Sequence, residues 1–160
     1  MFEIGDKIVY PMHGAGIIEA IEEKEILGER RNYYVLRMPI GEMKVMVPIN
    51  NADVVGIRPV IDSEEVGQVF RVLQAEDSPM STNWNRRYRH NMEKIKTGNI
   101  FELAEVVRNL SVRDKEKGLS TGEKKMLDNA RQILLSELVL AKGEGDNGDY
   151  IRSLLQEYLA

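Results

Sequence analysis

The sequence predicts an α+β protein, in which a small β-barrel precedes a bundle of about five helices. All five prolines lie in the first half of the 160 residues and none follows Pro79. Because proline disrupts helix interiors, long helices are expected mainly in the second half. After Pro59 the apolar residues also change from short Val-, Ile- and Tyr-rich runs to a helical repeat. We therefore predict two domains, residues 1–58 and 59–160.

Five short strands are expected in the first domain, separated by turn residues at positions 5–6, 27–29 and 40–42. The expected strands are Lys7–Tyr10, Gly16–Ile26, Asn32–Met38, Met43–Val47 and Val54–Ile57. Strands of this length and spacing are typical of an antiparallel Tudor or SH3-like barrel. Because a barrel this small has a small core, its edge strands are available to a partner.

Capping residues and apolar periodicity locate the helices of the second domain. The first expected helix runs from the capping box Asp62–Glu65 to about Ala75, and the second runs from about Asn83 to Lys96. The third begins at Asn99 and frays in the charged run Arg113–Lys117, and the fourth runs from the capping box Ser120–Glu123 to about Lys142. A polar linker, Gly143–Asp149, precedes the last helix, Tyr150–Leu159.

Composition excludes several classes of protein. The chain has no cysteine, so disulfides, Cys-type zinc sites and thiol nucleophiles are excluded. Its longest charge-free runs are far shorter than the ~20 residues that span a bilayer, and the opening residues do not resemble a signal peptide. We therefore expect a cytoplasmic protein. A net charge of −4 argues against non-specific binding to bulk DNA or anionic membranes. Any contact with nucleic acid must then come from a local basic patch.

No catalytic residue, cofactor or metal site is expected. The sequence has none of the common nucleophile, phosphate-loop, dinucleotide or zinc motifs. The tight Gly14-Ala15-Gly16 segment follows a strand without a helix after it, so a turn is favoured over a phosphate cradle. The two histidines, His13 and His90, fall in different domains, whereas a metal site needs three or more convergent ligands. An enzyme with a small-molecule substrate is the least favoured hypothesis.

One segment has a composition suited to nucleic acid. Residues 84–96 hold the only tryptophan and carry five Lys or Arg against one Glu. Basic groups bind phosphates, and a flat ring can stack on bases or wedge between them. The spacing of Trp84, Tyr88, Met92 and Ile95 is also typical of a buried helix stripe. That spacing favours a core position for Trp84, whereas its place in the first turn favours partial exposure, and the sequence leaves both open.

Two other surfaces are candidates. Lysines at positions 115, 117, 124 and 125 cluster near Gly118, where a solvated face is favoured over phosphate contact. In the barrel, residues 22–26 and 44–47 could form an exposed edge. Strand alternation places Met46 on the face opposite its two valine neighbours, and an exposed methionine suits an interface.

Several motifs resemble the CarD/CdnL family of bacterial transcription regulators. The opening Phe2-x-Ile-Gly-Asp-Lys-Ile-Val-Tyr-Pro-x-His-Gly-Ala-Gly16 is similar to the start of that family, and to the polymerase-interacting module of transcription-repair coupling factor. The resemblance continues through Val47-Pro48, Asn83-Trp84-x-Arg86-Arg87-Tyr88, Ala104-Glu105-Val106-Val107-Arg108-x-Leu110 and Gly118-Leu-Ser-x-Gly-Glu-Lys124-x-Met126-Leu127. It covers nearly the whole chain, and the last motifs make it specific for the two-domain family.

The resemblance implies an adaptor that contacts two partners. The Tudor-like barrel of the family docks on the lobe of the RNA polymerase β subunit, and Lys24, Ile26 and Met46 match its contact positions. Some relatives carry a basic residue where this chain has Met46, so that contact would be apolar here.

The helical domain of the family contacts promoter DNA at the upstream edge of the melted bubble. Trp84 matches a minor-groove wedge, and Arg86, Arg87 and Arg89 match basic DNA-contacting positions. The implied result is a longer-lived open complex with the housekeeping sigma factor, from a monomer held at the nucleoid through polymerase. The competing hypothesis is a polymerase adaptor without DNA contact, in which Trp84 belongs to the core.

Overall fold

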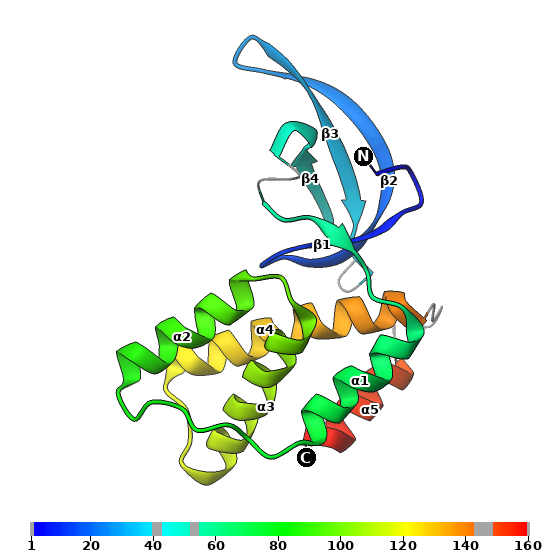
Figure 1. Cartoon of the computed structure of the whole chain (residues 1–160). Helices are drawn as coiled ribbons and strands as arrows, with labels where there is room; N and C mark the ends of the chain where they lie inside the picture. The colour runs from blue at the N-terminus through cyan, green and yellow to red at the C-terminus, as the bar shows by residue number, and fades with distance from the viewer. Residues whose placement is uncertain (1, 40–42, 52–54, 143–148, 160) are drawn as a thin grey trace.

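The computed structural model describes residues 2–39, 43–51, 55–142 and 149–159, and within these ranges it confirms the α+β prediction. A β domain stands above a helical domain (Figure 1). The strands are β1 (Lys7–Tyr10), β2 (Gly14–Ile26), β3 (Glu29–Arg37), β4 (Lys44–Pro48) and β5 (Arg58–Pro59). The helices are α1 (Ser63–Gln74), α2 (Trp84–Lys96), α3 (Ile100–Glu116), α4 (Thr121–Lys142) and α5 (Asp149–Leu159). The predicted turn at 40–42 and the linker up to residue 148 lie outside the described residues.

The strands form one antiparallel sheet in the order β4-β3-β2-β1-β5. The long β2–β3 pair runs from Ile17↔Arg37 to Ile26↔Glu29, with a shift of register between Ile18 and Ala20. Bulges of this kind bend a strand and increase its twist. The sheet encloses a small core: Ile8, Ile18, Tyr34, Leu36, Met38 and Val47.

The predicted position of the fifth strand was wrong. Val54 lies outside the described residues, and the chain turns at Gly56, which has a φ of +77°. The strand begins only at Arg58 and pairs with β1 through Val9↔Arg58 and Ile8↔Pro59. Proline is tolerated there because β5 is an edge strand, so its missing N–H breaks no ladder bond.

Local side-chain caps begin the helices where the sequence predicts. Asp62 and Glu65 make a complete capping box at α1, and Asn83 caps α2 by accepting from the backbone N–H of Arg86. Asn99 accepts from two backbone N–H groups at the start of α3. That helix ends at Glu116, within the charged run Arg113–Lys117 where its end was expected. The core of the bundle is built mainly from α1, α3 and α4, with residues such as Val69, Val107, Leu110, Leu134 and Leu138 fully buried.

The β domain rests directly on the C-terminal half of α4 (Figure 1). The backbone N–H of Ala15 donates to Ser136 Oγ at 2.9 Å. Gly14 has a φ of +113°, and a Cβ there would lie 2.8 Å from Ser136 Oγ. Both the backbone conformation and the close approach therefore require glycine. Gly14 packs against the helix, and a Cβ on Gly16 would lie 2.8 Å from Sδ of Met38, which accounts for both glycines without a phosphate.

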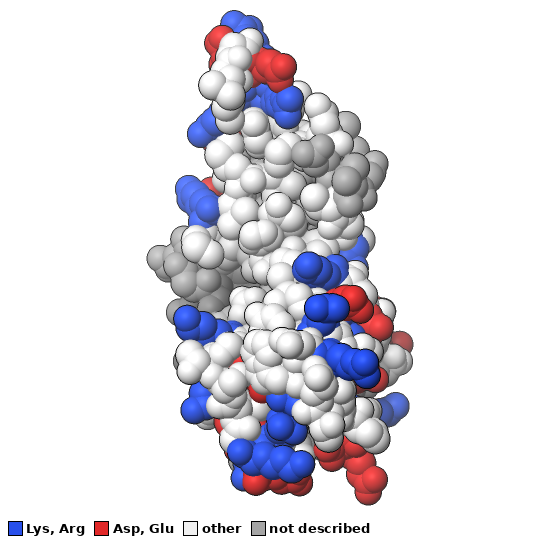
Figure 2. All heavy atoms as spheres, turned by 90° about the vertical axis from the view of Figure 1, so that its left-hand side faces the viewer, with Lys and Arg blue, Asp and Glu red and all other residues white. Residues whose placement is uncertain are grey.

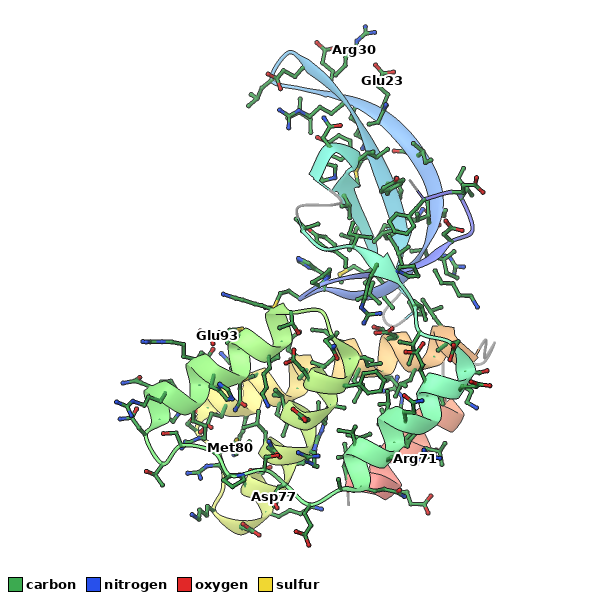
Figure 3. All side chains as sticks on the ribbon, viewed as in Figure 1. Glu23, Arg30, Arg71, Asp77, Met80 and Glu93 are labelled. Atoms are coloured by element: carbon green, nitrogen blue, oxygen red, sulfur yellow. The ribbon has the colours of Figure 1, made fainter. Side chains whose placement is uncertain are left out.

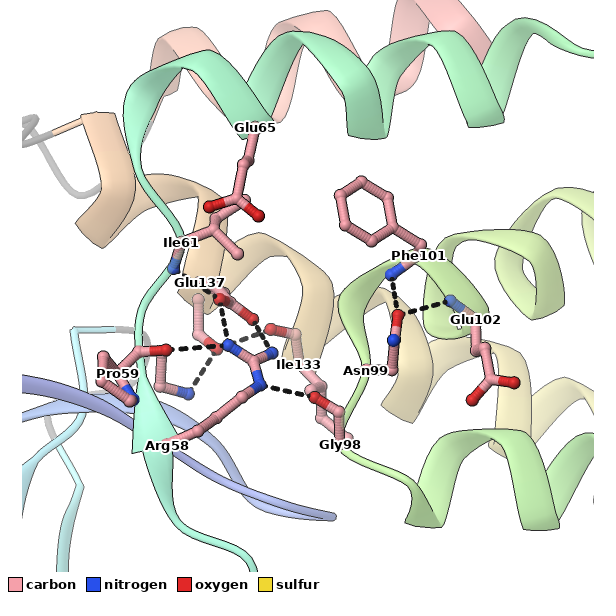
Figure 4. Close-up of polar contacts among 12 residues, drawn as sticks. Arg58, Pro59, Ile61, Glu65, Gly98, Asn99, Phe101, Glu102, Ile133 and Glu137 are labelled. Carbon is pink, nitrogen blue, oxygen red and sulfur yellow. Dashed lines mark hydrogen bonds and ion pairs between the residues drawn. The ribbon is translucent and has the colours of Figure 1, made fainter.

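An ion pair between Arg58 and Glu137 completes this domain interface (Figure 4). The guanidinium donates to both carboxylate oxygens of Glu137 at 2.7 Å, and its Nε donates to the carbonyl oxygen of Gly98. The backbone N–H of Ile61 also donates to Glu137. Because the Glu137 side chain is only 3% exposed, its charge depends on these partners. The two domains are therefore joined by contacts with α4 as well as by the covalent connection between β5 and α1.

We expect Glu137→Ala to destabilise the protein by about 2–3 kcal/mol. Removing one partner of a buried pair costs about 3–5 kcal/mol, and the 28% exposure of Arg58 reduces that cost. Urea unfolding measures the loss, and small-angle scattering should show a wider spread of interdomain distances. Glu105→Ala is the matched control, since it breaks the more exposed Lys94–Glu105 pair and should cost less than about 1 kcal/mol. Equal losses in the two variants would contradict this account.

Candidate nucleic-acid interface and docking arm

Trp84 is the first residue of α2 and lies on the surface. Its side chain is 42% exposed, so the core position that its spacing favoured is wrong. The indole Nε1–H donates to Ser120 Oγ at 2.9 Å. One face of the indole stacks on Tyr88, with ring centroids 5.0 Å apart and planes 19° apart. The ring is thus held in one orientation while part of it faces solvent.

The buried stripe of α2 runs through Arg87, Asn91 and Ile95 instead. Tyr88 and Met92 are half-buried beside it and pack against the helical core. The inward face is therefore rotated relative to the line of aromatic and apolar residues, and Trp84 falls outside it. Apolar periodicity could not reveal this because two of the three inward residues are polar.

The structure buries Arg87, which the family resemblance placed among the DNA-contacting residues. Its side chain is 4% exposed, and its Nε and Nη2 donate to the two carboxylate oxygens of Glu123 at 2.7 and 3.0 Å. Its Nη1 donates to the carbonyl oxygen of Ser81 at 3.1 Å, so all three guanidinium nitrogens are bonded within the protein and the buried group is not accessible to a phosphate. The hydrogen bond from Arg87 lowers the pKa of Glu123, against burial, which acts in the opposite direction. Arg87 therefore joins α2 to α4.

Arg86 and Arg89 are exposed on the same helix as Trp84. Both line a hollow that also contains His90, and Arg89 lines a second hollow together with Trp84 and Lys96. Figure 2 shows Lys and Arg spread over the helical domain on this side of the molecule, with acidic side chains among them. Lys124 and Lys125 are exposed in the first turns of α4. The corner formed by the starts of α2 and α4 is thus basic at its surface, although the whole chain is acidic.

The three residues predicted to bind polymerase share one face of the sheet. Beyond Tyr33, the last partner of β4, strands β2 and β3 continue as a two-stranded arm that projects from the β domain (Figure 1). Lys24 and Ile26 are two residues apart on β2 and therefore share a face. Lys24 is paired with Arg31 on β3. Val35 lies four residues after Arg31 and therefore on the same face, and Met46 on β4 is paired with Val35, so Met46 shares the face of Lys24.

The two faces of the arm differ in chemistry. Ile26 is 52% exposed and Met46 is half-buried on the outer face. The opposite face carries Glu23, Glu25 and Arg30, and Glu23 and Arg30 lie near its tip (Figure 3). Leu27, at the tip, is fully exposed with a φ of +53°. The outer face therefore presents apolar groups together with Lys24 and Arg31, and it also carries Glu22 and Glu29, of which Glu29 is paired with Arg31 at 2.7 Å.

Ser120 and Gly122 both contact the indole of Trp84, and neither was predicted to do so from the sequence. Ser120 was expected only as the cap of α4, which it is, since its Oγ accepts from the backbone N–H of Glu123. A Cβ on Gly122 would lie 3.5 Å from Cζ2 of Trp84, so the indole edge lies over this glycine. The paired spacings Trp84-x-x-Arg87 and Ser120-x-x-Glu123 were a usable signal, because residues three apart share a helix face.

Comparison with known proteins places the chain in a family. Residues 2–61 match the CarD-like/TRCF RID domain and residues 68–149 match the CarD C-terminal domain. The Bacillus subtilis (strain 168) protein named "Putative transcription factor YdeB" is 54% identical over 143 residues, which cover 89% of this chain and 94% of that protein. The solved structure of CdnLNt from Myxococcus xanthus is 44% identical, with a TM-score of 0.34, and covers 38% of this chain and 86% of that one.

The two matched domains in this order define a CarD-type transcription factor. The chain belongs to the CarD/CdnL family, which is related to RNA polymerase interaction. This membership confirms the predicted family and the prediction that the protein is not an enzyme. Within the described residues, no helix has the length and apolar character needed to cross a membrane.

We expect Glu123→Gln to reduce the free energy of unfolding by about 3–5 kcal/mol at neutral pH, because it leaves Arg87 buried without a counter-charge. The pKa of Glu123 is lower in the folded than in the unfolded protein. The ion pair therefore stabilises the fold fully above the ordinary pKa of glutamic acid, and this stability is lost as pH falls through the lowered value. Urea unfolding from neutral to acidic pH should show the gap between wild type and variant narrowing. A gap that widens on acidification would contradict the prediction.

Proposed function

We propose that this protein docks on the RNA polymerase β subunit through residues 1–58 and stabilises the promoter open complex through residues 59–160. The observation that carries the proposal is an exposed tryptophan, held in one orientation at a basic corner of the helical domain. In this proposal Trp84 enters the minor groove at the upstream edge of the bubble, while Arg86 and Arg89 bind flanking phosphates. Arg87 is left out of the contact set because it is buried against Glu123.

The energetics suit stabilisation of DNA that polymerase has already opened. Inserting a ring costs a few kcal/mol of unstacking, and base stacking on an aromatic side chain returns about 1–3 kcal/mol. Two arginine contacts give a salt slope of only about −2. The net charge of −4 further opposes binding to free duplex. The helical domain alone should therefore bind DNA weakly and act where polymerase holds it near the promoter.

The outer face of the arm is the proposed polymerase contact. Lys24, Ile26 and Met46 lie on that face, with Arg31 opposite Lys24. Arg31 is paired with Glu29 on the same strand at 2.7 Å, so Lys24 supplies the cationic contact that an acidic partner would complete. We propose that the partner surface is apolar with carboxylates at its rim, that the housekeeping sigma factor is present in the complex, and that the protein acts as a cytoplasmic monomer associated with the nucleoid through polymerase.

We expect Trp84→Ala to remove most of the stabilisation of open complexes while costing only about 1–2 kcal/mol of folding stability. A half-exposed ring loses much less than the 3–5 kcal/mol typical of a buried aromatic. The measurement is the lifetime of open complexes after competitor challenge, paired with urea unfolding. Polymerase affinity should stay at the wild-type value. An unchanged lifetime would support the alternative, a polymerase adaptor without DNA contact.

The double variant Lys24→Ala with Ile26→Ala should weaken binding to polymerase by at least tenfold. It removes a cation and an exposed apolar contact from the outer face of the arm. The matched control is Glu25→Ala with Arg30→Ala, a cross-strand pair on the opposite face of the same arm. Binding of immobilised polymerase by each purified variant gives the comparison. Equal weakening by both double variants would mean that the arm has no preferred docking face.

A further inference from the structure

The Ser120 hydroxyl makes three hydrogen bonds, which is its full capacity. It accepts from Trp84 Nε1 at 2.9 Å and from the backbone N–H of Glu123 at 3.2 Å, and it donates to Glu123 Oε1 at 3.3 Å. A serine hydroxyl has one hydrogen to donate and two lone pairs to accept with. Because its hydrogen is directed to the carboxylate, both lone pairs are free for the indole and the backbone. The carboxylate thus orients the hydroxyl toward Trp84.

The four side chains form a closed cycle between two helices. Trp84 and Arg87 come from the first turn of α2, and Ser120 and Glu123 come from the N-cap and first turn of α4. Arg87 donates two hydrogen bonds to Glu123, so α2, which carries the indole, is bonded directly to α4, which begins beside the indole's acceptor Ser120. Neither helix start can shift relative to the other without breaking a buried ion pair. The acceptor for the indole is therefore fixed in place.

The remaining contacts of the indole restrict its rotation. Tyr88 covers one face of the ring, and Gly122 lies under its edge with no side chain to displace it. A free surface tryptophan samples several rotamers, and binding must then select one at an entropic cost. Here the hydrogen bond to Ser120 selects the rotamer before any partner arrives.

We propose that Ser120 is a positioning residue, which holds the indole of Trp84 in the orientation that enters the minor groove. Its effect on promoters rests on the proposed function, whereas its effect on the indole does not. Ser120 touches neither polymerase nor DNA in this proposal and acts only through Trp84. The cap of α4 and the orientation of the wedge then depend on one hydroxyl group.

Ser120→Ala tests this directly, because Trp84 is the only tryptophan and reports without interference. In the free full-length protein, the variant should show faster exchange of the indole N–H by NMR and lower fluorescence anisotropy. Ser120→Thr keeps the hydroxyl and should restore both signals. Asp62→Ala is the matched control, since it removes a capping box at α1 without touching Trp84. It should lose similar stability and leave the indole unchanged.

The open-complex lifetime gives the functional readout. Ser120→Ala should shorten the lifetime two- to tenfold, which is the range expected from a hydrogen bond of about 0.5–1.5 kcal/mol. Trp84→Phe keeps a ring but loses the indole N–H, so adding Ser120→Ala to it should cause no further loss. Ser120→Thr should behave as wild type.

The outcomes separate this inference from the proposed function. An indole signal unchanged by Ser120→Ala overturns the positioning role. A freed indole with a normal lifetime also overturns it, provided that Trp84→Ala still shortens the lifetime, in which case the proposed function stands. If Trp84→Ala has no effect on lifetime, the proposed function fails and the indole measurements alone decide whether Ser120 holds the ring. An equal loss of lifetime with Asp62→Ala would assign the effect to general destabilisation and overturn the inference.

Discussion

Helix α4 carries two buried carboxylates, and the arrangement of the whole molecule depends on them. Glu123 receives Arg87 from α2, and Glu137 receives Arg58 from β5. The two glutamates are 14 residues apart on one helix, which corresponds to about 21 Å along its axis. One end of α4 thus holds the helix that bears Trp84, and the other end holds the β domain. Buried ion pairs add little net stability compared with apolar packing, so their main consequence here is the choice of one arrangement.

This arrangement links the two candidate surfaces through a single rigid element. The connection between the domains is short and contains Pro59, which by itself gives a stiff hinge. The structure adds contacts that a hinge would not have, because Ala15 and Lys7 donate to groups on α4 and Gly14 fits closely against Ser136. Opening the hinge would expose Glu137 without its partners. The two domains therefore behave as one body, and the direction of the arm is coupled to the position of Trp84.

The sequence predicted most elements of the fold because their signals are local. The capping box at Asp62 and the side-chain cap at Ser120 set the start of two helices, and alternation placed Met46 on the outer face of the sheet. Besides the fifth strand and Trp84, what the sequence did not reveal concerns charged residues whose partners lie far along the chain. Arg87 was expected to contact DNA because it matches a basic DNA-contacting position of the family, and only Glu123, 36 residues away, makes its burial stable. No periodicity encodes such a pair, and the same holds for Arg58 and Glu137, which fasten the domain interface.

The combination of two small contact surfaces and a rigid body has a consequence for the proposed mechanism. A flexible tether would raise the local concentration of the helical domain near the promoter. The helical domain would then sample many positions, so its effective concentration at any one of them would be modest. A rigid connection gives the helical domain a high effective concentration at one position relative to polymerase and almost none at other positions. Docking of the arm then places Trp84 at one fixed distance from polymerase, and only DNA melted at that distance offers the wedge a site. Specificity for the edge of the bubble can thus arise from α4 and its two ion pairs, without any contact that reads base sequence.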